Sequence, residues 1–145
     1  MKLVLCCVFL LFTSLVYAQE EKVLSNSNDA VKWYYEAQIK VNSQDFDAAT
    51  ALLQKAIAAD NHFAEALKVL GDIMRKQKKY EEAAKNYERV IQLRPRFIYQ
   101  AYLALGISQF NQMKYAEARQ NFKNYLNSGQ GVEESIRKAN EYVEN

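Results

Sequence analysis

Apolar side chains recur at the spacing of one helix face from about residue 30 to the end of the chain, and short polar gaps interrupt them. A spacing of three and four residues is typical of amphipathic helices. The gaps at 42–45, 77–79 and 111–114 have the length of turns that join neighbouring helices. The pattern therefore predicts helix-turn-helix units and an all-α fold.

The same order of large and small residues occurs three times, in steps of 34 and then 35 positions, as from Trp33 to Leu67 to Tyr102. A constant period of this size is the signature of a repeat architecture. Five further columns keep the register: Ala37, Gly71 and Gly106; Phe46, Tyr80 and Tyr115; Ala49, Ala83 and Ala118; Leu53, Tyr87 and Phe122; Ala56, Val90 and Tyr125. The small columns are expected where two antiparallel helices approach closely, and Phe46, Tyr80 and Tyr115 are expected to begin the second helices.

The second unit resembles the tetratricopeptide (TPR) consensus through Ala66-Leu67, Leu70-Gly71, Tyr80, Ala83-Ala84, Tyr87 and Pro95. The third unit lacks the closing proline, and the first has Glu36-Ala37 in place of Leu-Gly. The resemblance implies a right-handed TPR superhelix of three helix-turn-helix repeats, at about 30–62, 63–97 and 98–131. Because the matching residues are packing residues, they specify the fold and not a function.

The two ends of the repeat region differ from the units between them. Residues 132–145 repeat apolar positions at helical spacing among charged ones, which predicts a C-terminal capping helix with a polar outer face. Residues 19–28 are polar and are expected to form a flexible N-terminal segment, with Asn28 or Asp29 capping the first helix.

Residues 1–18 have the pattern of a secretory signal peptide. Lys2 precedes an apolar stretch of about 14 residues, shorter than the roughly 20 that span a bilayer, and Ala18 offers a small residue for cleavage. We therefore expect export to the periplasm, the cell envelope or the exterior, and no integral membrane span after cleavage. An uncleaved anchor is one alternative. A lipoprotein acylated at Cys6 is another, which the bulky Leu5 disfavours.

The composition excludes several classes of function. Removing residues 1–18 would take away both cysteines and Lys2, so the net charge would fall from +2 to +1. A near-neutral chain lacks the basic footprint of a nucleic-acid-binding protein. His62 is the single histidine, and no glycine-rich phosphate loop or metal-ligand cluster occurs. We expect neither a cofactor nor a metal nor an enzymatic activity.

The TPR resemblance implies binding of a protein or peptide partner in a concave groove lined by the first helix of each repeat. The corresponding positions are Tyr34, Gln38, Val41, Glu65, Lys68, Asp72, Arg75, Gln100, Leu103, Ile107 and Phe110. Some TPR proteins clamp acidic chaperone tails with basic and amide side chains in this groove. The matching positions here are Tyr34, Gln38, Val69, Gln100 and Ala104, which disfavours chaperone binding.

Residues 97–113 contain no charged side chain, unlike the other two first helices. Leu103, Ile107 and Phe110 form an apolar stripe beside the packing face of this helix. A helix that is apolar on two faces is usually buried on both. Either neighbouring helices cover the stripe or it receives a segment of a ligand.

Two functions remain open at this stage. One is an interaction module or scaffold of the Gram-negative cell envelope, since the arrangement also resembles the N-terminal TPR part of envelope proteins that continue into a β-propeller and a peptidoglycan-binding domain. The other is a structural or assembly protein that self-associates through its groove. A monomer favours the first.

Overall fold

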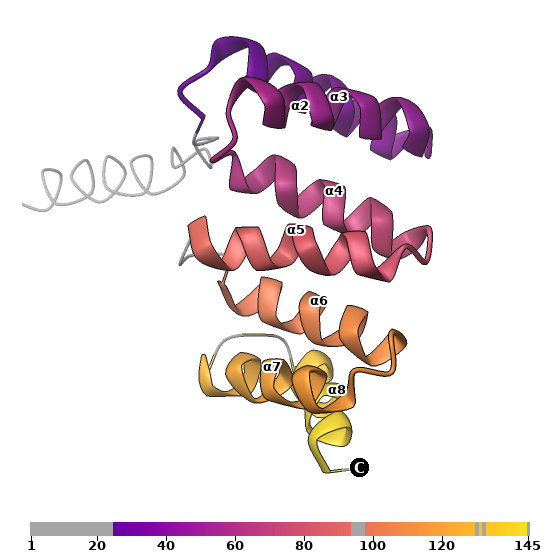
Figure 1. The fold of residues 1–145 in the computed structure, drawn as a ribbon, viewed down its shortest axis with the longest axis vertical. Coiled ribbons are helices and arrows are strands. Elements are labelled where there is room, and N and C mark those ends of the chain that lie inside the picture. The colour runs from indigo at the N-terminus through magenta and orange to yellow at the C-terminus, as the bar shows by residue number, and fades with distance from the viewer. Residues whose placement is uncertain (1–24, 94–97, 130, 132, 145) are drawn as a thin grey trace, which may run out of the picture.

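The computed structural model describes residues 25–93, 98–129, 131 and 133–144. Its regular elements in these ranges are all helices, stacked in consecutive antiparallel pairs along the long axis of the molecule (Figure 1). They are α2 (Asn28–Asn42), α3 (Phe46–Ala59), α4 (Ala64–Lys76), α5 (Tyr80–Leu93), α6 (Ile98–Asn111), α7 (Tyr115–Asn127) and α8 (Glu133–Glu144). The predicted all-α solenoid of the TPR type is confirmed. The proposed signal peptide and Pro95 lie outside the described residues.

The second helix of each repeat begins where the aromatic column predicted, at Phe46, Tyr80 and Tyr115. The turns before these helices share one geometry, since Gln44, Lys78 and Met113 all have a left-handed backbone with φ near 60°. In each turn the next residue donates its N–H to a carbonyl five residues earlier, over 2.8–2.9 Å. This bond satisfies a carbonyl that the end of the first helix would otherwise leave without a partner.

The N-terminal cap differs from the expectation. Ser27 holds an extended backbone, and its side chain accepts a hydrogen bond from the Ala30 N–H over 3.2 Å. Asn28 is already helical, so the prediction of Asn28 or Asp29 as the cap is wrong by one or two positions. The serine hydroxyl performs the same function as the predicted asparagine or aspartate oxygen, because all these side chains accept from exposed N–H groups.

The predicted flexible segment 19–28 is only in part within the described residues. The Ser25 hydroxyl donates a 2.6 Å hydrogen bond to the Asp60 carboxylate in the turn between α3 and α4. This bond lowers the pKa of Asp60, together with the backbone N–H of His62. The chain is therefore tied to the first repeat before α2 begins.

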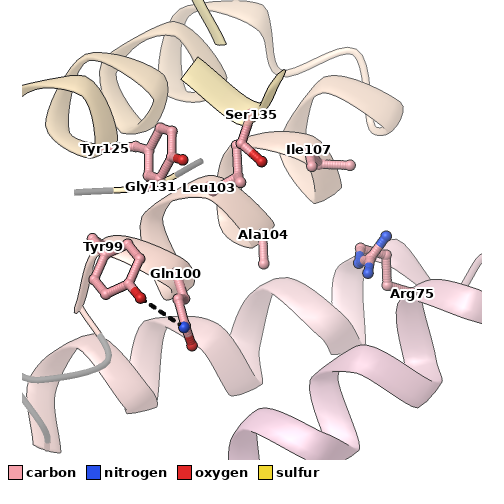
Figure 2. Close-up of a pocket in the computed structure, with 9 residues that line it drawn as sticks. All are labelled: Arg75, Tyr99, Gln100, Leu103, Ala104, Ile107, Tyr125, Gly131 and Ser135. Carbon is pink, nitrogen blue, oxygen red and sulfur yellow. Dashed lines mark hydrogen bonds between the residues drawn. The ribbon is translucent and has the colours of Figure 1, made fainter. Parts of the chain in front are cut away.

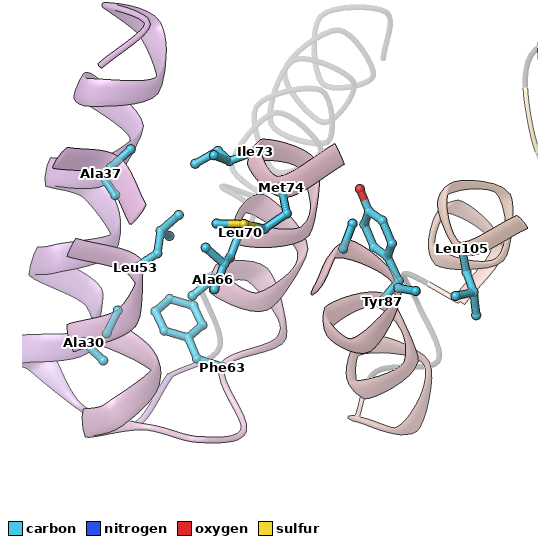
Figure 3. Packing of buried hydrophobic residues seen from close by; sticks show 14 residues of the cluster. Ala30, Ala37, Leu53, Phe63, Ala66, Leu70, Ile73, Met74, Tyr87 and Leu105 are labelled. Carbon is cyan, nitrogen blue, oxygen red and sulfur yellow. The ribbon is translucent and has the colours of Figure 1, made fainter. Parts of the chain in front are cut away.

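The two glycines in the column of Ala37, Gly71 and Gly106 each face an aromatic ring on the second helix of the same repeat. A Cβ atom on Gly71 would lie 2.8 Å from the Tyr87 ring, and one on Gly106 would lie 2.7 Å from the Phe122 ring. Both rings are fully buried. In the first repeat the smaller Leu53 occupies the ring column and an alanine is tolerated opposite it (Figure 3). The close approach was predicted, but it joins a helix backbone to an aromatic ring.

Helix α8 follows α7 as the predicted capping helix. Ala139 is its one fully buried residue within the described part of the chain. On its exposed side Arg137 forms ion pairs with Glu134 and Glu141. A helix with one apolar face and a charged outer face closes the last repeat against water.

Candidate functional site

A cavity of about 400 Å³ lies beside the third repeat, between α4, α6, α7 and the start of α8 (Figure 2). We call it the third-repeat cavity. Its lining residues are Arg75, Tyr99, Gln100, Leu103, Ala104, Ile107, Tyr125, Gly131 and Ser135.

The wall that α6 contributes is apolar. Leu103, Ala104 and Ile107 are each half-buried, and α6 carries no charged residue. Leu103 and Ile107 also pack against the cluster of buried residues formed by α7 and α8. Leu103 and Ile107 are therefore covered by neighbouring helices on one side and open to the third-repeat cavity on the other.

The far end of the cavity is built from aromatic side chains. The Tyr99 ring stacks on Tyr125 with 6.4 Å between the centroids, and the Gln100 amide donates to the Tyr99 hydroxyl over 2.9 Å. Gly131 has a φ of 132°, and a Cβ atom there would overlap the Tyr125 hydroxyl. The segment before α8 can therefore cross the Tyr125 ring only with glycine at this position.

At the other end the cavity is lined by Arg75, which belongs to a hydrogen-bonded charge cluster of α4 and α5. The Tyr87 hydroxyl donates to Asp72 Oδ1 over 2.8 Å, and Lys68 Nζ lies 3.1 Å from Asp72 Oδ2. Arg75 Nε donates to the Tyr87 hydroxyl over 3.4 Å. Burial and the Asp72 charge raise the pKa of Tyr87, so its hydroxyl stays protonated at neutral pH and remains a donor. Because Lys68 and Arg75 surround the Asp72 carboxylate, the cluster has a net charge of +1. Arg75 is the member of the cluster that lines the cavity.

The predicted groove residues separate into three groups. Arg75, Gln100, Leu103 and Ile107 meet at the third-repeat cavity, and Lys68 and Asp72 adjoin it through the charge cluster. From α2, Tyr34 and Val41 are half-buried against the main core, with the Tyr34 ring 5.1 Å from that of Phe63. Gln38 is half-buried on the same helix and does not line the cavity.

Two predicted positions lie elsewhere. Glu65 is only 7 % exposed, so it is buried instead of lining a groove. Phe110 does not line the third-repeat cavity with Leu103 and Ile107. It lies one turn further along α6, where its ring contacts Tyr115 at 5.3 Å and Tyr142 at 4.7 Å between centroids. These rings line a second cavity of about 480 Å³ at the α6–α7 turn. The Phe110 ring packs against Tyr142 of α8, a contact that the predicted stripe did not include.

Four of the lining residues were not predicted from the sequence: Tyr99, Tyr125, Gly131 and Ser135. Tyr125 was assigned to a packing column, and the segment around α8 was assigned only a capping role. Gly131 was the available signal, because a second glycine so close to Gly129 exceeds what one helix end requires.

No helix in the described ranges combines the length and the apolar character needed to cross a bilayer. Within the same ranges, no three histidine, cysteine or acidic side chains gather as a metal site would require. His62 is exposed at the turn before α4.

Comparison with known proteins identifies a repeat family. The profile of the family described as the tetratricopeptide repeat protein 21 C-terminal ARM domain matches residues 19–118. No curated protein sequence matches the chain significantly.

Several solved TPR domains share the fold. The first TPR domain of Spaghetti (RPAP3), bound to the HSP90 peptide SRMEEVD, is 18 % identical with a TM-score of 0.74, over 82 % of this chain and 94 % of that one. The second TPR domain of human RPAP3, in complex with the HSP70 peptide SGPTIEEVD, is 22 % identical with a TM-score of 0.70, over 79 % of this chain and 94 % of that one. The N-terminal domain of stress-induced protein-1 from C. elegans is 21 % identical with a TM-score of 0.71, over 81 % of this chain and 98 % of that one.

Proposed function

This chain belongs to the family of the tetratricopeptide repeat protein 21 C-terminal ARM domain, and we propose that it is a protein-interaction module. Its third-repeat cavity binds a segment of a partner protein. The observation that carries the proposal is the half-open apolar wall of α6, formed by Leu103, Ala104 and Ile107, beside a guanidinium group. Concave apolar surfaces with a few placed polar groups are the usual form of ligand sites.

The cavity defines the chemistry of the segment. An aliphatic side chain placed between Leu103 and Ile107 completes the burial of a wall that is now half-exposed, and such burial contributes about 25 cal/mol for each Å² removed from water. Arg75 retains N–H groups beyond those that face Tyr87 and Asp72, and they suit a carbonyl or carboxylate oxygen of the same segment.

Acidic chaperone tails are a poor match for this site. The TPR domains of RPAP3 were solved with peptides that end in Glu-Glu-Val-Asp. The positions that correspond to the basic clamp here are Tyr34, Gln38, Val69, Gln100 and Ala104, none of which is charged. The single cation of the cavity, Arg75, already shares its charge with Asp72. We therefore expect an aliphatic segment with at most one acidic group.

The test selects ligands from a library of random 12-residue peptides displayed on phage and measures the affinity of the selected peptides by calorimetry. We expect Leu103→Asp to weaken binding at least tenfold, equivalent to about 1.4 kcal/mol, because it places a carboxylate in the apolar wall. Leu126→Asp is the matched control. Leu126 is half-buried against the same α7–α8 cluster but does not line the cavity.

Two results would overturn the proposal. An equal loss of affinity in both variants, with equal loss of helical signal, would assign the effect to stability. Tight binding of SRMEEVD or SGPTIEEVD would mean that the ligand class is wrong; we expect their Kd to be weaker than about 1 mM.

We further propose that the module acts outside the cytoplasm, as a scaffold of the cell envelope. The support is the charged start and apolar stretch of residues 1–16, followed by Ala18. The mature protein is then expected to begin at Gln19. Intact-mass spectrometry of the protein isolated from its cells tests this, and retention of Met1 or a lipid adduct on Cys6 would contradict it.

A further inference from the structure

The second repeat differs from its neighbours in one buried polar group. Leu53, Tyr87 and Phe122 occupy the same position on the second helix of each repeat, and all three side chains are fully buried. The Phe122 ring packs beside Gly106 as the Tyr87 ring packs beside Gly71. Packing at this position therefore requires the ring of Tyr87 but not its hydroxyl.

The charged groove side chains occur in this same repeat. At the positions of Lys68, Asp72 and Arg75 on α4, the helices α2 and α6 have uncharged residues: Tyr34, Gln38 and Val41, and Leu103, Ile107 and Phe110. The hydroxyl in the packing column and the charges in the groove thus occur together, on the two helices where they meet.

The Tyr87 hydroxyl contacts both members of an ion pair. It donates to Asp72 Oδ1 over 2.8 Å and accepts from Arg75 Nε over 3.4 Å. Arg75 Nη2 lies 3.9 Å from the same Asp72 oxygen, which is longer than a direct hydrogen bond. Because the Tyr87 ring is buried against Gly71, its hydroxyl is a fixed point to which the guanidinium is attached.

We propose that Tyr87 is a positioning residue for partner binding, whose hydroxyl holds the Arg75 guanidinium at the third-repeat cavity to take one carboxylate of the bound segment. This inference rests on the proposed function of the cavity. Arg75 faces Ala104 and Ile107 of α6 across the cavity (Figure 2). Because its Nε and Nη2 atoms face Tyr87 and Asp72, its Nη1 atom keeps its N–H groups for a ligand oxygen.

The charge of the cluster and the order of the arginine side chain both favour a carboxylate. Lys68 and Arg75 together exceed the charge of Asp72 by one, so the cluster attracts one anionic group more strongly than an uncharged amide. An arginine side chain that is already held in place loses less rotamer freedom when a ligand binds. Removal of the Tyr87 hydroxyl is therefore expected to weaken the binding of a carboxylate and to leave the apolar wall unchanged.

Nuclear magnetic relaxation of the Arg75 Nε–Hε group in the isotope-labelled full chain tests the positioning without a ligand. The signal is assigned by its loss in Arg75→Lys. We expect a heteronuclear NOE like that of the helical backbone in the unmodified chain, and one like that of the exposed Arg119 in Tyr87→Phe. Tyr80→Phe is the matched control, because it removes a hydroxyl from a half-buried residue of the same helix that does not line the cavity. It should leave the Arg75 signal unchanged.

N-acetylleucine and N-acetylleucinamide test the consequence for binding, by chemical-shift titration of the same chains. Both compounds carry an aliphatic side chain for the wall of Leu103 and Ile107, and only the first has a carboxylate. We expect the unmodified chain and Tyr80→Phe to prefer N-acetylleucine by about fivefold, and Tyr87→Phe to prefer it by less than about twofold. Because a loss of stability would weaken both compounds equally, this preference separates positioning from folding.

Two results would overturn the inference: an Arg75 side chain that stays equally ordered in Tyr87→Phe, or a preference for the carboxylate that this variant retains. Failure of both compounds to bind the unmodified chain would contradict the proposed function of the cavity, and binding through Tyr87 with it. The relaxation measurement distinguishes the two failures, because it reports whether Tyr87 holds Arg75 when no ligand is present.

Discussion

Replacement of Tyr87 with alanine is expected to lower the free energy of unfolding by about 3–5 kcal/mol, as for other large buried aromatic residues. The Tyr87 ring is fully buried, and it fills the space that Gly71 leaves on the facing helix. Its hydroxyl also holds the Asp72 carboxylate at 2.8 Å. Alanine leaves a cavity between α4 and α5 and releases one end of the charge cluster. Urea unfolding followed by far-UV circular dichroism measures the change.

Tyr87→Phe separates the two contributions. It keeps the ring and removes the hydroxyl, and Asp72 retains Lys68 and Arg75 as partners. We expect a loss of about 1 kcal/mol, the usual net contribution of a hydrogen bond. A loss in Tyr87→Phe as large as that in Tyr87→Ala would mean that the charge cluster, and not ring packing, holds α4 and α5 together.

Gly106→Leu is expected to cost about 3 kcal/mol, at the upper end of the range for overpacked cores. Even a single Cβ atom at this position would lie 2.7 Å from the Phe122 ring, and a leucine adds three further carbons. The ring has little room to move, because Tyr142 stacks on its other side at 4.7 Å. Thermal unfolding compared with the unmodified chain tests this expectation.

Gly106→Ala gives a sharper version of the same test, because two effects oppose each other. Alanine improves helix propensity by about 1 kcal/mol, whereas its methyl group meets the Phe122 ring. We expect the contact to dominate and the protein to lose stability. In a Phe122→Leu background the contact is relieved, and there Gly106→Ala should be stabilising. Stabilisation in both backgrounds would show that the helices separate at little cost.

Much of the fold could be predicted from the sequence because the same pattern of large and small residues occurs in all three repeats. The columns of Ala37, Gly71 and Gly106, and of the aromatic residues that begin the second helices, specify where helices approach and where they start. These features depend on local spacing and on residue volume, both of which a sequence displays. The all-α solenoid, its turns and its last helix therefore follow from the pattern alone.

The candidate site could be predicted only in part. Arg75, Leu103 and Ile107 were placed by their register on the first helices, and they do meet at one cavity. Phe110 follows the same spacing but belongs to another surface, because Tyr142 from α8 packs on it. The spacing of residues along α6 does not show which side chains of a later helix pack against the end of α6.

Tertiary structure alone decided which apolar residues are exposed and which charges are compensated. Ile39 and Ile73 occupy the same register, yet Ile39 is 67 % exposed on α2, whereas Ile73 is buried on α4, against which α3 packs. Asp72 was predicted as a groove charge, but its carboxylate is held by Tyr87 from the neighbouring helix. Exposure and pairing depend on contacts between residues that are distant in sequence, and a pattern of spacing along one chain does not contain those contacts.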